Sequence, residues 1–201
     1  MAKRPFERKD RFYLQAKKEG YPARSAYKIM ELDDRYQIFK PGRKIVDIGA
    51  APGGWMKVAQ ERLKGQGKLA GIDLLPIKFA LNASSFFLQG DFMDAENRQK
   101  IKDFLGGPAD WVICDISPNI SGIKFRDEFQ SYQYGMQALH FAIEVLKPGG
   151  GFLFKNFPGP EIQELRQELK KNFGKIKTVV PEATRKSSTE IYIVCLEKIK
   201  K

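Results

Sequence analysis

The glycine-rich segment at residues 45–55, IVDIGAAPGGW, constrains the fold of this chain more than any other stretch. A short apolar run ends in Asp47, which can accept hydrogen bonds from a cationic or hydroxyl-bearing ligand. The chain then turns through Gly49 and Gly53 into a helical pattern, as in the opening unit of a nucleotide-binding α/β sheet. The turn lacks G-x-G-x-x-G spacing, and Pro52 removes an N–H that a diphosphate would use. The turn therefore favours a nucleoside ligand without a diphosphate over NAD. In the alternative interpretation, the glycines serve only the packing of the strand against the helix.

Strands and helices alternate along the rest of the chain, and several strands end in a charged residue. This alternation predicts a mostly parallel sheet covered by helices, with the last two strands forming one antiparallel hairpin at an edge. Ligands of such sheets bind at the carboxyl ends of the strands. We expect strands near residues 44–48, 68–73, 86–91, 109–115, 152–155, 176–180 and 190–196. The first five of these strands have a charged residue at or next to their carboxyl end: Asp47, Asp73, Asp91, Asp115 and Lys155.

The helical segments follow from apolar spacing and from glycine and proline breaks. Residues 125–131 are polar, and we expect them to be a mobile loop. Lys28 lies off the apolar stripe of its helix and on its own is an ordinary surface lysine. We expect helices near residues 25–32, 54–64, 95–104, 134–146 and 160–173.

The length of 201 residues and the 42% of apolar residues suit one domain with a full core. We expect one domain over 1–201, made of a basic arm and helix (1–44) and an α/β core (45–201). Cys114 and Cys195 lie in apolar runs and are predicted to be buried free thiols. No membrane span, secretory signal or metal-ligand cluster is recognisable. We therefore expect a cytoplasmic monomer without a metal.

The net charge of +11 is distributed unevenly. Residues 1–44 carry 13 Lys and Arg against 6 Asp and Glu, and residues 165–201 carry 10 against 4, whereas residues 45–164 carry 12 against 14. Two basic ends around a nearly neutral centre favour a nucleic-acid partner. The alternative is a set of lysine-rich helices kept for solubility. Aromatic residues among the N-terminal cations either stack on bases or anchor the arm to the domain: Phe6, Phe12 and Tyr13.

Two motifs together resemble those of a known enzyme family. The segments 47–55, DIGAAPGGW, and 114–122, CDISPNISG, are similar to the cofactor loop and the fourth motif of the FtsJ/RrmJ-type RNA ribose 2′-O-methyltransferases. The resemblance extends from RSAYK at residues 24–28 to EIYIV at residues 190–194. It implies a Rossmann-like methyltransferase fold with a seven-stranded sheet, S-adenosylmethionine as cofactor and RNA as partner, with a uridine of large-subunit (23S-type) ribosomal RNA as the target.

The family's functional residues carry over onto matching residue types. The Lys-Asp-Lys-Glu tetrad of the family falls on Lys28, Asp115, Lys155 and Glu190. The family's cofactor contacts fall on Gly53, Trp55, Asp73, Asp91 and Asp115, and the loop residues Asp47 and Gly49 complete the predicted cofactor site. By the same resemblance Asp73 holds the ribose, Asp91 the adenine amino group, and the loop at Gly53 and Trp55 the methionine end.

The residue types of the tetrad suit methyl transfer to a ribose. A 2′-hydroxyl is a poor nucleophile at neutral pH, so in-line attack needs positioning and an acceptor for the departing proton. We expect Lys155 to be that acceptor, with Asp115 orienting it and Glu190 positioning Lys28 or the ribose. In the alternative, Lys155 stays charged and only steers the hydroxyl. Other functions left open are methylation of a tRNA or an mRNA cap, a non-catalytic RNA-binding assembly factor, and an NAD-dependent reductase.

Overall fold

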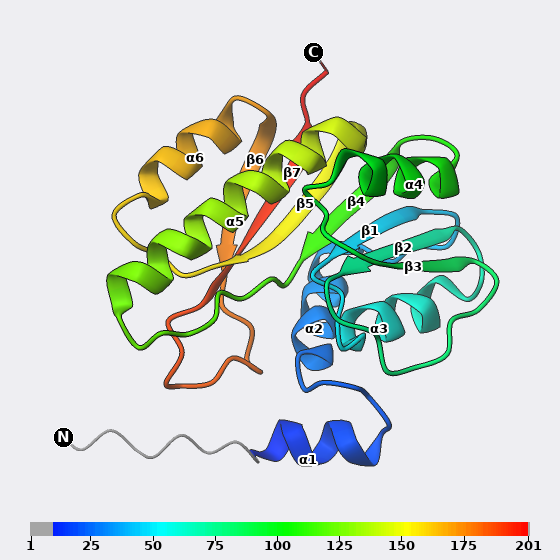
Figure 1. The fold of residues 1–201 in the computed structure, drawn as a ribbon, viewed down its shortest axis with the longest axis horizontal. Coiled ribbons are helices and arrows are strands. Elements are labelled where there is room, and N and C mark those ends of the chain that lie inside the picture. The colour runs from blue at the N-terminus through cyan, green and yellow to red at the C-terminus, as the bar shows by residue number, and fades with distance from the viewer. Residues whose placement is uncertain (1–9, 201) are drawn as a thin grey trace.

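The structure, a computed structural model, describes residues 10–200 and contains one seven-stranded sheet in the order β3-β2-β1-β4-β5-β7-β6 (Figure 1). Phe6 lies outside the described residues. All neighbouring pairs from β3 to β5 are parallel, whereas β7 is antiparallel to both β5 and β6. The strands are β1 (Lys44–Ile48), β2 (Lys68–Asp73), β3 (Ser85–Gln89), β4 (Ala109–Cys114), β5 (Leu146–Asn156), β6 (Phe173–Val179) and β7 (Ile191–Lys198).

Helices cover both faces of the sheet (Figure 1). In β1, Val46 and Ile48 pack into the core under α4, α5 and α6, whereas Ile45 packs into the core under α2 and α3. Burial on both faces explains why the strands read as continuous apolar runs. The helices are α1 (Arg11–Lys18), α2 (Ala26–Tyr36), α3 (Gly54–Leu63), α4 (Ala95–Leu105), α5 (Lys124–Val145) and α6 (Ile162–Lys170).

The expected fold class is confirmed, and the structure adds the place of the antiparallel strand. The final hairpin of β6 and β7 lies at the sheet edge, but its second strand inserts between β5 and β6. Because β7 runs against the other strands, its first residues lie at the edge where the parallel strands end. This insertion brings Glu190 and Tyr192 to the same edge as Asp115 and Lys155.

The expectation of a mobile loop at residues 125–131 is wrong, because α5 already begins at Lys124. Its first turns bury polar side chains, which hydrophobic periodicity does not detect. Asp127 accepts hydrogen bonds from Ser121 N (2.9 Å) and Ser121 Oγ (2.7 Å). Ser131 is buried and accepts a hydrogen bond from Phe157 N at 2.9 Å. Polar anchoring therefore fixes this segment as helix.

Several smaller expectations were also tested by the structure. Phe12 contacts the ring of Tyr27, with 5.5 Å between ring centroids, which supports an anchoring role for Phe12, whereas Tyr13 is exposed. Cys114 and Cys195 are buried free thiols, as expected, and burial raises the pKa of Cys114 to about 12. Within residues 10–200, no helix is both long and apolar enough to cross a bilayer.

Candidate active site

A cavity of about 700 Å³ opens at the carboxyl ends of β1, β2, β3 and β4. Its volume is within the range of about 300–1,000 Å³ typical of small-ligand sites. Three carboxylates line it together with apolar walls and four neutral polar side chains, Ser117, Asn119, Tyr134 and Gln137. Carboxylates without a neighbouring Lys or Arg suit a ligand carrying a positive charge, hydroxyls and an amino group. The lining includes Gly49, Ile72, Asp73, Leu74, Asp91, Phe92, Met93 and Asp115.

Backbone hydrogen bonds orient two of these carboxylates. Asp73 accepts from Ala51 N and from Leu75 N, both at 2.9 Å. Asp91 accepts from Met93 N at 2.8 Å. Each carboxylate oxygen has a second lone pair, so both side chains can still accept from a ligand. Fixed orientation with spare acceptor capacity is what a nucleoside site requires.

Gly49 is needed at the cavity for a steric reason. Its φ is +75°, and a Cβ there would lie 2.4 Å from Ile116 Cγ1. The loop after β1 therefore passes directly against the loop after β4, and any larger residue would push them apart. This contact closes the cavity on the side of β4.

Three residues that the sequence placed at the cofactor are not among the residues lining this cavity. Asp47 is fully buried, and neither of its carboxylate oxygens has a hydrogen-bond partner among the described residues. Burial, and then the charges of Asp115 and Asp73, hold the pKa of Asp47 well above its usual range. Gly53, with φ +104°, lies against Phe79. The remaining residue of the three is Trp55.

Trp55 instead connects the elements that carry the tetrad. Its indole Nε1 donates to the Ser25 carbonyl at 3.0 Å, and Ser25 directly precedes α2. Its ring lies 5.8 Å from the ring of Tyr192 in β7, centroid to centroid. This buried indole thus holds the start of α2, which carries Lys28, against the strand that follows Glu190.

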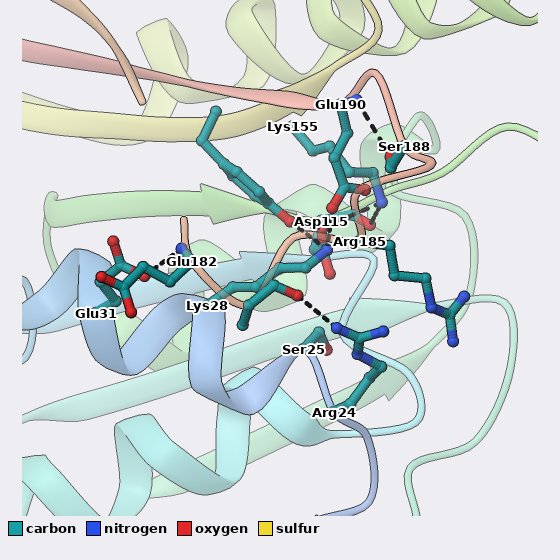
Figure 2. Close-up of polar contacts among 12 residues, drawn as sticks. Arg24, Ser25, Lys28, Glu31, Asp115, Lys155, Glu182, Arg185, Ser188 and Glu190 are labelled. Carbon is teal, nitrogen blue, oxygen red and sulfur yellow. Dashed lines mark hydrogen bonds and ion pairs between the residues drawn. The ribbon is translucent and has the colours of Figure 1, made fainter. Parts of the chain in front are cut away.

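The tetrad forms two lysine–carboxylate pairs (Figure 2). Lys155 Nζ lies 3.1 Å from Asp115 Oδ1 and donates to the Asp115 carbonyl at 2.8 Å. Lys28 Nζ forms an ion pair and hydrogen bond with Glu190 Oε1. The side chains of Lys155 and Lys28 are only 6% and 11% exposed, and pairing is what makes such burial of charge tolerable.

Tyr192, which the sequence reading did not single out, joins the two pairs. Its hydroxyl donates to Asp115 Oδ1 at 2.7 Å and accepts from Lys28 Nζ at 3.4 Å. The register of β5 and β7 pairs Tyr192 with Lys155, so both side chains reach the same face. Burial, and then the charge of Asp115, raises the pKa of Tyr192 well above its usual range, so the hydroxyl stays protonated as a donor. A tyrosine within an apolar strand is typical of core packing, so no sequence signal marks it.

A second cavity, of about 670 Å³, lies next to the tetrad. Lys28 and Glu190 contribute to its wall, and Ser117 lines both cavities, so the two are adjacent at the loop after β4. The loop between β6 and β7 supplies hydroxyls and a guanidinium. The lining includes Arg24, Ile120, Lys124, Glu128, Phe157, Arg185, Ser187, Ser188 and Thr189.

Both basic ends of the chain meet at this second cavity. Arg24, before α2, forms an ion pair with Asp10 and donates to the Ala183 carbonyl at 2.5 Å. Arg185 Nε lies 3.3 Å from the same Asp10 carboxylate. The contact joins residues 175 positions apart. Cations from the N-terminal and C-terminal regions thus line one wall.

Comparisons with known proteins identify the family of this chain. The family model described as FtsJ-like methyltransferase matches residues 21–198. Ribosomal RNA large subunit methyltransferase E of Nitrosospira multiformis is 44% identical over 94% of this chain and 91% of its own length. The protein of that name from Methanothermobacter thermautotrophicus is 42% identical over 93% and 89%. A crystal structure of a Plasmodium falciparum protein assigned as a ribosomal RNA methyltransferase has a TM-score of 0.79 and 28% identity, over 90% of this chain and all of that one. The chain therefore belongs to the FtsJ-like methyltransferase family.

Proposed function

We propose that this protein transfers the methyl group of S-adenosylmethionine to a ribose 2′-hydroxyl of large-subunit ribosomal RNA. The observation that carries the proposal is the pair of lysine–carboxylate contacts beside two adjacent cavities. Asp115 lines the first cavity, Lys28 and Glu190 line the second, and Lys155 lines neither but contacts Asp115. One cavity suits a cationic nucleoside, and the other has cations and hydroxyls that suit an RNA strand. Methyl transfer between two nucleosides needs this side-by-side arrangement.

In the first cavity the carboxylates would hold the cofactor. Asp73 is placed to accept from ribose hydroxyls and Asp91 from the adenine amino group, while Asp115 offers a negative charge to the sulfonium side. S-adenosylmethionine, when bound, supplies an electrophilic methyl group. The low polarity of the walls at Ile72 and Phe92 strengthens these electrostatic contacts.

At the junction, the tetrad would hold the ribose and take its proton. Lys28, fixed by Glu190, is placed to hydrogen-bond the sugar. Lys155, in its neutral amine form, would accept the proton of the 2′-hydroxyl and become the ammonium that pairs with Asp115, which orients Nζ through the 3.1 Å contact. Because the side chains are held by their own hydrogen bonds before substrate arrives, little reorganisation is needed during the reaction.

The identity of the RNA is inferred from the relatives. The curated relatives act, by name, on the large-subunit ribosomal RNA, and the identity extends over most of both chains. We propose the same substrate here, with a uridine as target nucleotide, in a cytoplasmic, single-domain monomer that needs no metal. Methylation of a tRNA or an mRNA cap is the second candidate. Mapping 2′-O-methyl groups in cellular RNA with and without this chain distinguishes them, because only one RNA class would lose a modification.

Replacing the proposed proton acceptor tests the chemistry. Lys155→Ala should lower the rate of methyl transfer at least 100-fold, since general-base catalysis contributes roughly 10²–10⁴. Cofactor affinity, measured by calorimetry, should persist. Lys155→Met replaces the amine with an uncharged side chain of similar length. It should lower the rate of methyl transfer as much as Lys155→Ala does if the loss of packing is not what lowers the rate.

The matched control is Lys175→Ala, which removes an exposed lysine paired with Glu197 where β6 begins, away from the carboxyl edge. An exposed pair contributes little to stability. The control should transfer methyl groups at the wild-type rate. Near-normal transfer by Lys155→Ala would rule out the assigned role.

A further inference from the structure

Large apolar side chains are concentrated on the surface between residues 120 and 129, beside the second cavity. Ile120, Ile123 and Phe125 are 64%, 61% and 62% exposed, and Phe129 is 40% exposed. Clustered exposed apolar groups of this kind mark interaction sites more often than isolated ones do. None of these residues belongs to the tetrad, and none lines the first cavity.

The aromatic residues of the cluster are aligned along α5. Phe125 and Phe129 are one helical turn apart, with ring centroids 6.4 Å apart and planes inclined by 14°. Tyr132 continues the series, with its ring 6.1 Å from that of Phe129, but it is partly buried and packs against the core. We call Phe125, Phe129 and Tyr132 the aromatic strip. Spacing of four and three residues places its members on one side of the helix.

The aromatic strip borders the second cavity. Lys124 and Glu128 line that cavity and directly precede Phe125 and Phe129 in α5. Ile120, in the loop before the helix, also lines it. An RNA strand that leaves the cavity over α5 would therefore meet the strip next.

Charge around the strip favours a negatively charged partner. Arg126 is exposed, and so is Lys124, although its Nζ lies 3.6 Å from Glu128 Oε1; Asp127 and Glu128 are buried. Hydrogen bonds from Ser121 lower the pKa of Asp127 and engage its carboxylate in holding the loop. Flat apolar faces next to exposed cations match unpaired nucleotides, whose bases stack and whose phosphates are anionic.

We propose that the aromatic strip stacks on unpaired bases that flank the ribose in the second cavity, so that the RNA is single-stranded or splayed at this site. The inference rests on the proposed function for the choice of RNA. Stacking explains why aromatic rather than aliphatic side chains stand at 125 and 129, since aromatic rings present a π face to any base.

The test compares two double variants in binding to a fluorescein-labelled, unstructured single-stranded RNA oligonucleotide and to an RNA duplex of equal length. Phe125→Leu with Phe129→Leu keeps an apolar surface but removes the rings. Its dissociation constant for the single strand should rise roughly 5- to 150-fold. Phe125→Tyr with Phe129→Tyr should bind almost as wild type does, and duplex affinity should change little in either variant.

The matched control is Ile199→Ala, which removes another exposed apolar side chain just after β7, at the opposite edge of the sheet. It should leave RNA affinity unchanged, and cofactor affinity in all variants should match wild type. Equal weakening by the leucine and tyrosine pairs, or none by the leucine pair, would overturn the inference. So would a change of oligomeric state in the leucine pair, seen by light scattering, because the strip would then be a contact between copies.

The same preparations separate this inference from the proposed function. If wild type transfers no methyl group to ribosomal RNA while the leucine pair still loses single-strand affinity, the proposed function is wrong but the inference that the aromatic strip binds single-stranded RNA holds. If wild type methylates RNA and the leucine pair binds normally, the function remains and the strip fails.

Discussion

Tyr192 connects two charged pairs that would otherwise act separately. Its hydroxyl donates to Asp115 and accepts from Lys28, so the positions of both tetrad halves depend on one buried oxygen. Its ring also packs against Trp55 and lies under Lys28 Nζ at 5.6 Å from the centroid. The side chain therefore has a packing role and a hydrogen-bonding role that one substitution can separate.

Tyr192→Phe keeps the ring and removes the hydroxyl. We expect kcat to fall roughly 10- to 100-fold, because a hydrogen bond to a charged group contributes about 1.5–3 kcal/mol. Steady-state kinetics should show an unchanged KM for the cofactor, since Tyr192 does not line that cavity. Tyr36→Phe, at the far end of α2, is the control. An unchanged kcat in Tyr192→Phe would mean that the hydroxyl has no part in positioning.

Asp47 gives a prediction about stability and pH. Its folded-state pKa is held well above the ordinary value by burial and by the charges of Asp115 and Asp73. The folded state therefore binds its proton more tightly than the unfolded chain does. The difference in pKa has no effect on stability below about pH 4, the unfolded pKa, and it increasingly destabilises the fold as pH rises toward the folded pKa.

Asp47→Asn removes that ionisation. In urea unfolding the variant should gain about 1–3 kcal/mol over wild type at neutral pH, and the gain should shrink as pH falls toward 4. Asp103→Asn, an exposed carboxylate of α4, should show no such pH-dependent difference. A gain that does not vary with pH would contradict the assigned cause.

Residue types alone identified only part of the site. Asp73, Asp91, Asp115 and Lys155 were found from strand ends, because the carboxyl edge of a parallel sheet follows from chain direction. Lys28 was found through family resemblance, since it lies off the apolar stripe and is buried only through its pair with Glu190. The catalytic and cofactor roles of these residues stay predictions.

At the level of elements, apolar patterns predicted the positions of most strands and helices. They did not predict features that depend on polar contacts or on the order in which strands pair. The bounds of β1 and β2 agree with expectation because each is an uninterrupted buried run. The start of α5 was missed because its buried residues include Asp127, Glu128 and Ser131. The insertion of β7 between β5 and β6 was also missed, since strand order depends on contacts far apart in sequence.

That insertion matters for function as much as for topology. A seventh strand parallel to the others would begin at the opposite edge, and Glu190 would then lie far from Asp115. Reversing one strand instead brings residues from near the end of the chain into contact with α2, as the Lys28–Glu190 pair shows. The tetrad therefore draws on α2, β4, β5 and β7, and all of these must be in place before the site exists.

In the whole molecule, charged residues from all three regions of the sequence line the second cavity. The N-terminal region supplies Arg24, the C-terminal region supplies Arg185, and the central region supplies Lys124, all to one cavity wall. Asp10 lies between the two arginines and holds them near each other. Four cationic side chains line this cavity together with the carboxylates of Asp127, Glu128 and Glu190, whereas carboxylates without any Lys or Arg line the first cavity. We expect the excess of cations to attract the phosphates of RNA.

This separation of charge predicts different salt dependences for the two ligands. Each phosphate contact that a cation makes should steepen the fall of log affinity for RNA with log salt by about 0.7–0.9. Lys124→Ala should therefore reduce that slope by about one such step, measured by fluorescence anisotropy over a salt series. Lys100→Ala, on α4, is the matched control, because each lysine pairs with a glutamate one helical turn away, Lys100 with Glu96 and Lys124 with Glu128, and only Lys124 lines the cavity. The control should leave the slope unchanged. Cofactor affinity in both variants should vary little with salt, since its site is a partly enclosed cavity that small ions screen weakly. If Lys124→Ala does not alter the salt dependence of RNA affinity, the RNA binds elsewhere on the surface. The cations that line the second cavity would then not be an RNA-binding site.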